Sequence, residues 1–127
     1  MEIFRAETTP RTPYLNLNPT TGVFEMKGKS IPENSVGYYK PMFEWFAQYI
    51  ENPAPTTKLY IHLDYFNTSS SKIIVDLFKK LEQLHKSGKS QAEIVWVYSE
   101  DDEDMQEAGE DYKSILKLPF TIQTNNT

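Results

Sequence analysis

The sequence contains no cysteine, and this absence excludes several kinds of site at once. Without a thiol the chain can form no disulfide framework, no thiolate zinc site and no cysteine nucleophile. A chain without cysteine fits a reducing compartment.

Basic residues are also scarce: 13 Lys and Arg stand against 18 Asp and Glu, which gives a formal net charge of -5. No basic stripe appears, so the sequence lacks the electrostatic footprint of a nucleic-acid binder. The amino terminus lacks the basic start and apolar run of a signal peptide, and no apolar segment approaches the length of a membrane span. We therefore expect a cytoplasmic protein that binds neither nucleic acid nor membranes.

The chain is long enough for one core. Its 127 residues are 39% hydrophobic and 13% aromatic, which suits a single domain over residues 1–127. Two alternating segments, Tyr14 to Leu17 and Val23 to Lys27, flank the turn-forming residues 18–22 and predict a β-hairpin. Pro41 suits the first turn of a helix, so we expect a helix from Pro41 to Glu51, with a helical turn from Asn34 as an extension.

The middle of the chain predicts a strand followed directly by a helix. Residues 57–66 alternate, which places Leu59, Ile61, Leu63 and Tyr65 on one face and Tyr60, His62, Asp64 and Phe66 on the other. Residues 70–86 have helical periodicity, carried by Ile74, Leu77, Phe78, Leu81 and Leu84. Gly88 lies where a glycine commonly caps a helix.

The last third repeats this alternation. Residues 92–99 form a continuous apolar strand, and Met105, Ala108, Tyr112 and Ile115 mark a third helix behind an acidic start. Pro119 ends that helix, residues 120–123 can form a last strand, and "TNNT" at the end is expected to fray. The resulting βαβαβ pattern favours parallel strands, so with the hairpin it predicts an α/β domain with a mixed sheet and three main helices.

Hydroxyl and amide side chains gather where the second helix is expected to begin. Asn67 is followed by four consecutive hydroxyl residues, Thr68, Ser69, Ser70 and Ser71. Capping of unpaired N–H groups, which contributes about 1 kcal/mol, is the simpler interpretation. The alternative is a phosphoacceptor, because a phosphate on Thr68 or a neighbour would meet the positive end of the helix dipole, with Lys72 as a counterion.

Two other clusters offer weaker chemistry. The acidic run "SEDDEDMQE" has the first ligand spacing of an EF-hand at Asp102 and Asp104, but Glu107 stands where the central glycine belongs, so a solvated helix start is favoured over a Mg²⁺ or basic-partner contact. A Ser-His-Asp triad could be drawn from His62, Asp64 and a serine of residues 69–71. No nucleophile elbow or Gly-rich phosphate cradle supports such an enzyme.

An aromatic cluster accompanies the first helix. It comprises Tyr38, Tyr39, Phe43, Trp45, Phe46 and Tyr49. We expect Phe43, Phe46 and Tyr49 or Ile50 to form the buried face. Trp45 lies off that face and is a candidate for a partner surface, where Trp is enriched.

The segments "YYKPMFEWFAQYI", "LDYFNTSSSK" and "SEDDEDMQEAGEDY" together resemble the SiaC family of bacterial regulatory phosphoproteins, and the resemblance extends from "TPYLNLNPTTGVFEMKGKSIPEN" to "LPF". It implies a single STAS-like domain, similar to anti-anti-sigma factors. The family's phosphorylated threonine, in "FNTSS", corresponds to Thr68. The docking loop would comprise Asp64, Phe66, Asn67, Ser69, Ser70, Ser71 and Lys72.

The resemblance also implies the partners and the role. A histidine-kinase-like Ser/Thr protein kinase phosphorylates the family's threonine, a PP2C-like phosphatase reverses this, and the unphosphorylated protein activates a diguanylate cyclase that controls aggregation and biofilm formation. We therefore expect a non-enzymatic, phosphorylation-switched adaptor without cofactor or metal. The alternatives are a small hydrolase-like enzyme using His62, Asp64 and the serines, and a purely structural or oligomerising domain.

Overall fold

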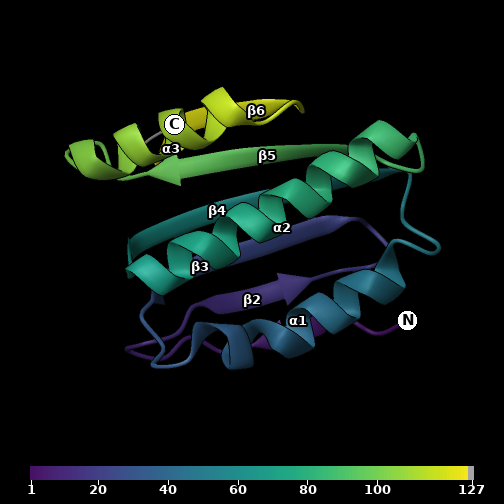
Figure 1. The fold of residues 1–127 in the computed structure, drawn as a ribbon, viewed down its shortest axis with the longest axis horizontal. Coiled ribbons are helices and arrows are strands. Elements are labelled where there is room, and N and C mark those ends of the chain that lie inside the picture. Colours follow the sequence, from purple (N-terminus) through teal and green to yellow (C-terminus); the bar gives the residue numbers. More distant parts are fainter. Residues whose placement is uncertain (126–127) are drawn as a thin grey trace.

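One mixed sheet holds all the strands, and their order across the sheet is their order along the chain. The computed structural model describes residues 1–125. Its strands are β1 Phe4–Ala6, β2 Tyr14–Leu17, β3 Val23–Ser30, β4 Thr56–Phe66, β5 Gln91–Tyr98 and β6 Phe120–Thr124; its helices are α1 Ser35–Tyr49, α2 Thr68–Ser87 and α3 Glu103–Ile115 (Figure 1). Strands β1 to β3 pair antiparallel, and β3 to β6 pair parallel. The predicted α/β class and mixed sheet are confirmed.

The three helices cover the same face of the sheet. Each connects a parallel strand to its next neighbour, and right-handed connections that step in one direction place all their helices on one side. Phe78 of α2 and Tyr112 of α3 both pack on Trp96 of β5, with ring centroids 6.2 Å and 5.4 Å away. Phe46 of α1 packs on Phe24 of β3 at 6.3 Å. The core therefore lies between this layer of helices and the sheet.

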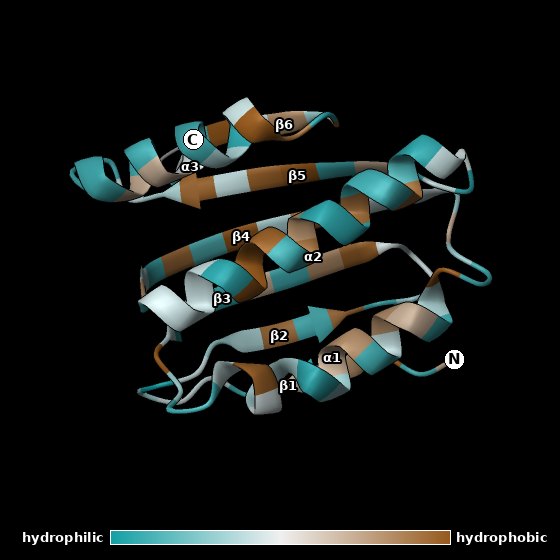
Figure 2. Cartoon of the chain, viewed as in Figure 1, coloured by the Kyte–Doolittle hydropathy of each residue, from teal (hydrophilic) through white to brown (hydrophobic). Residues whose placement is uncertain are grey.

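Within residues 1–125 no helix covers the other face of the sheet, and most of its side chains are polar or half-buried, with Val95 as a buried exception. Lys27 pairs with Glu25 at 2.7 Å, and Lys58 with Glu93 at 3.6 Å. Hydropathy follows the same division, with hydrophobic segments along β4 and β5 and hydrophilic residues on the outer side of α2 (Figure 2). Within residues 1–125, no helix combines the length and apolar composition needed to cross a bilayer.

Helix α1 begins earlier than predicted. Asn34 caps it, its side chain accepting a hydrogen bond from the Gly37 N–H at 3.0 Å. Pro41 therefore lies inside the helix, and its placement in the first turn was wrong. Burial of Tyr39 and Met42 on either side of the proline maintains the helix there, although the ring removes one backbone hydrogen bond.

Strand β4 contains an irregularity that the alternation could not predict. Its pairing with β3 passes from Gly28–Leu63 to Lys29–Tyr65, so Asp64 is an extra residue in β4. The extra residue reverses the two faces beyond it. Tyr65 is 56% exposed rather than in the core, and Phe66 packs on Trp96 at 6.4 Å rather than on the open face.

The remaining boundaries agree closely with the sequence. The hairpin is confirmed, although β3 continues to Ser30, and α2 begins at Thr68 rather than at Ser70. Gly88 caps α2 in the left-handed conformation, with φ 78°. Strand β1 was not predicted. Of the expected fraying end, Thr124 belongs to β6 and the Asn125 N–H donates to a backbone carbonyl, whereas residues 126–127 lie outside the described part.

Candidate functional site

Asn67 connects the start of α2 to the segment between β3 and α1. Its backbone N–H donates to the Ser30 carbonyl at 3.0 Å, and its side-chain N–H donates to the Pro32 carbonyl at 3.3 Å. Its side-chain oxygen accepts from the Ser70 N–H at 2.9 Å, which makes Asn67 the N-cap. One residue thus caps the helix and fixes its position relative to β3.

Behind the cap lies a chain of buried hydroxyl groups. Ser30 Oγ lies 2.6 Å from the Tyr39 hydroxyl and 2.7 Å from Ser70 Oγ, and Ser70 Oγ donates to the Ser30 carbonyl at 2.9 Å. Each hydroxyl has one proton, so Ser30 donates to Ser70 and Tyr39 donates to Ser30. Burial raises the pKa of Tyr39 to about 12, with the Ser30 hydrogen bond acting in the opposite direction. The buried hydroxyls therefore join β3, α1 and α2.

Ser69 and Ser71 are engaged as well. Ser69 Oγ donates to the Asn67 side-chain oxygen at 3.1 Å and accepts from Ser35 Oγ of α1 at 2.7 Å. Ser71 Oγ donates to the Thr68 carbonyl at 2.6 Å. All three serines of the run are thus held in hydrogen bonds.

Thr68 differs from these serines. It is the first residue of α2 and is exposed, and its hydroxyl has no hydrogen-bond partner within residues 1–125. The N–H groups of Thr68 and Ser69 are also without partners in this described part, as is normal for a helix start. Thr68 therefore presents a free hydroxyl beside unpaired donors.

The other residues predicted around the loop have separate surroundings. Lys72 is exposed one helical turn after Thr68, where it could reach an anion on that residue. Asp64 is exposed at the bulge of β4, and Phe66 is half-buried against Trp96. Phe66 therefore anchors the end of β4 in the core, whereas Asp64 and Lys72 remain at the surface.

The structure does not assemble the Ser-His-Asp triad. His62 of β4 lies opposite Lys27 of β3 in the strand register. Its side chain lines a hollow on the helix-free face together with Tyr60 and Val97. The serines of residues 69–71 lie at the start of α2, on the helix side. Within residues 1–125 their side chains hydrogen-bond to neither a histidine nor a carboxylate. His62 Nε2 is buried without a partner in that same range.

The acidic run begins α3. Asp102 is the N-cap, its side chain accepting from the Met105 N–H at 3.1 Å, and Glu103 and Asp104 occupy the first turn. There the helix dipole favours negative charge. Among the described residues, no group of three or more His, Asp or Glu side chains is placed to hold a metal ion.

Trp45 is half-buried and packs within the fold, and its role as a partner contact stays a prediction. Its ring stacks on Tyr49 at 5.3 Å with an interplanar angle of 8°, and its Nε1–H donates to the Glu2 carbonyl at 2.8 Å. The amino-terminal segment covers it. The buried face of α1 instead comprises Ser35, Tyr39, Met42, Phe46 and Tyr49, and Phe43 lies at its flank.

Sequence reasoning missed Ser30, Ser35 and Tyr39 as members of the site. Ser35 follows the capping residue Asn34, a position where serine is ordinary, and Ser30 ends a strand. Their burial arises from contacts with Ser70, 40 and 35 residues along the chain. No local pattern distinguishes such serines from solvated ones.

Comparison with known proteins decides the family. Residues 6–125 match the family described as "SiaC family regulatory phosphoprotein". The chain belongs to the SiaC family. An uncharacterized protein of Pseudomonas aeruginosa (strain UCBPP-PA14) is 29% identical over 118 residues, which are 93% of each chain.

Solved structures agree with this membership. Apo-SiaC from Pseudomonas aeruginosa superposes with a TM-score of 0.87 at 28% identity, over 97% of this chain and 99% of that one. SiaC in complex with the diguanylate cyclase SiaD, of which it is the activator, gives a TM-score of 0.89 at 28% identity, over 96% and 99% of the two chains. The resemblance to the SiaC family is therefore confirmed in both sequence and fold.

Proposed function

We propose that this SiaC-family protein is a non-enzymatic cytoplasmic adaptor, switched by reversible phosphorylation of Thr68, whose unphosphorylated form binds and activates a diguanylate cyclase. The membership in a family of regulatory phosphoproteins supports the switch. The Pseudomonas aeruginosa SiaC that activates the cyclase SiaD supports the effector. The kinase would be histidine-kinase-like, the phosphatase PP2C-like, and the output biofilm and aggregation control.

The observation that carries the choice of Thr68 is the contrast within the hydroxyl run. Ser70 is fully buried, and Ser69 and Ser71 are held in hydrogen bonds. A kinase must bring the acceptor oxygen to the γ-phosphate of ATP, so an exposed hydroxyl without a partner is the easiest to reach. Thr68 has such a hydroxyl.

The position of Thr68 also indicates how the switch works. A phosphate there adds roughly two negative charges at neutral pH. At the start of a helix an anion is stabilised by about 0.3–1 kcal/mol, so the modification would not unfold α2. It would instead change the charge of an ordered surface, and partner binding would respond to that change.

A first experiment tests the acceptor. The purified protein is incubated with the kinase of the same organism and ATP, and its phosphorylation is followed by intact mass and site mapping. Incorporation should disappear in Thr68→Ala and persist in Ser71→Ala, a matched control in the same turn of α2. Equal incorporation in wild type and Thr68→Ala would refute the assignment.

A second experiment tests the effector. Binding to the diguanylate cyclase of the same organism is measured by calorimetry for wild type, Thr68→Val and Thr68→Asp. We expect Thr68→Asp to bind at least about tenfold more weakly, about 1.4 kcal/mol, while Thr68→Val, which is neutral and similar in shape, stays near wild type. Equal affinities of all three proteins would contradict the switch.

A further inference from the structure

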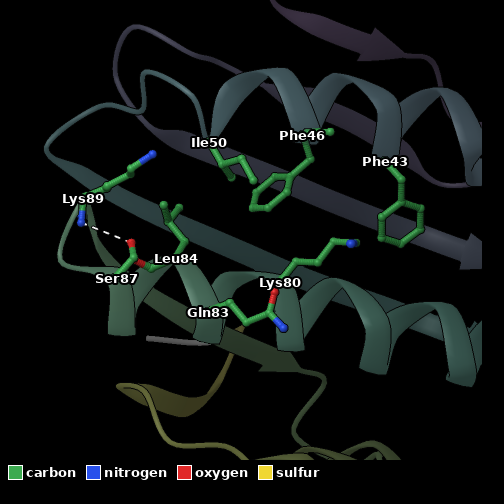
Figure 3. Close-up of a pocket in the computed structure, with 9 residues that line it drawn as sticks. Phe43, Phe46, Ile50, Lys80, Gln83, Leu84, Ser87 and Lys89 are labelled. Carbon is green, nitrogen blue, oxygen red and sulfur yellow. Dashed lines mark hydrogen bonds between the residues drawn. The ribbon is translucent and has the colours of Figure 1, made fainter.

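A surface groove runs between α1 and α2. Its narrower end is lined by Phe46, Ile50 and Leu84, and its wider, more open part continues through Phe43 to Val36 and Ile73. In the close-up, Phe43 and Phe46 of α1 and its C-cap residue Ile50 project toward α2, and Lys80, Gln83 and Leu84 of α2 lie opposite them (Figure 3). The floor of the groove is therefore apolar, and both helices supply it.

Lysines surround this apolar floor. They are Lys40, Lys79, Lys80 and Lys89, and all four are exposed. None of them has an ion pair within residues 1–125, and Asp76 is the one acidic residue of the lining. Lys80 Nζ lies 5.8 Å from the centre of the Phe43 ring. In a chain of net charge -5, this concentration of unpaired positive charge favours an acidic occupant.

The dimensions favour a helix over a small molecule. The narrower hollow has a volume of about 190 Å³, below the roughly 300–1,000 Å³ of pockets that enclose drug-sized ligands. It suits one apolar side chain. The wider part has about 480 Å³ but lies open along the surface, so it would not enclose a small ligand. The 15 residues of α1 span about 22 Å, so a helix of about four turns could lie along the groove.

We propose that the groove between α1 and α2 binds an acidic amphipathic helix of the effector, with an apolar side chain seated between Phe46, Ile50 and Leu84 and acidic side chains facing the lysines. This inference rests on the proposed function, because it specifies where the effector of that function docks. The mode combines apolar anchors in a groove with complementary charges at its rim.

The groove also explains how a phosphate on Thr68 could weaken docking. Ile73 lines the end of the groove near the start of α2. Ile73 lies five positions after Thr68, which corresponds to roughly 7.5 Å of helix and is within the screening length of about 8 Å at physiological ionic strength. A phosphate there would repel an acidic helix that reaches this end.

A second copy of the chain is the competing occupant, because α3 is itself acidic. Such a contact would join two different surfaces and would extend from copy to copy unless it closed into a ring. Light scattering at increasing concentration distinguishes the two. A monomeric mass supports an effector helix, and a concentration-dependent rise in mass that Lys79→Glu/Lys80→Glu abolishes would overturn it.

The decisive experiment measures binding to the diguanylate cyclase of the same organism by calorimetry. Lys79→Glu/Lys80→Glu reverses two groove lysines, and Lys113→Glu/Lys117→Glu makes the same change of charge at the end of α3 and just beyond it. Val36→Glu tests the open end of the groove, where Val36 is 73% exposed. Its matched control is Ile115→Glu, which changes an apolar side chain on α3 that is 57% exposed. Circular dichroism and urea melts establish that each variant is folded.

We expect the groove variants to bind at least about tenfold more weakly, and the α3 variants to stay within about twofold of wild type. The difference in affinity between wild type and Lys79→Glu/Lys80→Glu should shrink as the salt concentration rises from about 0.05 to 0.5 M, because salt screens the attraction between the lysines and the acidic helix. Groove variants that bind like wild type, while Thr68→Asp still binds weakly, would overturn the groove and leave the proposed function standing. A wild type that does not bind the cyclase would overturn both.

Discussion

Removing the Ser70 hydroxyl should destabilise the fold without abolishing phosphorylation. Ser70 Oγ is fully buried, donates to the Ser30 carbonyl at 2.9 Å and accepts from Ser30 Oγ at 2.7 Å. In Ser70→Ala the Ser30 hydroxyl loses its acceptor. The Ser30 carbonyl keeps its bond from the Asn67 N–H at 3.0 Å, so one buried hydroxyl proton is the group left without a partner.

The expected loss is about 2 kcal/mol. A buried polar group left unsatisfied costs about 1–3 kcal/mol. Thr68→Ala serves as the matched control, because it removes an exposed hydroxyl without a partner in the described part of the chain, and such substitutions change stability by about 0.5 kcal/mol or less. The two variants remove a hydroxyl from the same turn of α2 and differ in burial.

Urea denaturation followed by circular dichroism measures both. With a denaturant dependence of roughly 2 kcal/mol per molar urea, the midpoint of Ser70→Ala should fall by about 1 M and that of Thr68→Ala should hardly move. Incubation with the kinase should give the opposite ranking, with Ser70→Ala phosphorylated and Thr68→Ala not. Equal midpoints for the two variants would refute the division into structural and acceptor hydroxyls.

Further predictions concern the cap, a close contact and pH. Asn67→Ala should lower the free energy of unfolding by about 1–2 kcal/mol in urea melts, since it removes the N-cap of α2; a change equal to that of an exposed loop residue would contradict this. Gly109→Ala should cost about 1–3 kcal/mol and alter tryptophan fluorescence, because the new Cβ would lie 2.5 Å from Trp96 Cδ1. By contrast, Gly88→Ala, where the strain comes from a positive φ and the space around the new Cβ is open, should leave the fluorescence unchanged. The free energy of unfolding should fall as the pH rises from about 10 to 12, because the unfolded chain ionises a tyrosine near pH 10 while burial holds the pKa of Tyr39 at about 12. The variant Tyr39→Phe should be less stable at neutral pH but lose less stability over that interval. Parallel curves of stability against pH for the two proteins would contradict the assignment.

The sequence predicted most elements because their patterns are local. Hydrophobic periodicity located α2, and Gly88 marked its end, since a left-handed cap favours glycine. Strand β1 was not predicted, because its three residues are too few to show an alternating pattern. The start of α1 was predicted wrongly from Pro41, because burial of neighbouring side chains outweighed the preference of proline for the first turn of a helix.

The candidate site was predictable in its location but not in its division of roles. The run of hydroxyl residues predicted a capped helix start, and the family resemblance indicated Thr68 as the phosphorylated residue. That Ser70 would be buried while Thr68 is exposed depends on contacts with Ser30 and Ser35, which approach from other elements. The packing of Trp45 was unpredictable for the same reason, since the segment to which it hydrogen-bonds is distant in sequence.

The bulge in β4 and the apolar face of α2 together align the hydroxyl run. If the chain lacked the extra residue at Asp64, every later residue would move back by one position. Thr68 would then take the place of the cap, Ser69 that of Thr68 and Ser71 the buried place, so the four consecutive hydroxyl residues would fit either alignment. The helix would not, because the fully buried places of Phe78 and Leu81 would receive Lys79 and Glu82. The extra residue in β4 therefore lets apolar side chains fill the core beneath α2 while threonine rather than serine stands at the exposed place.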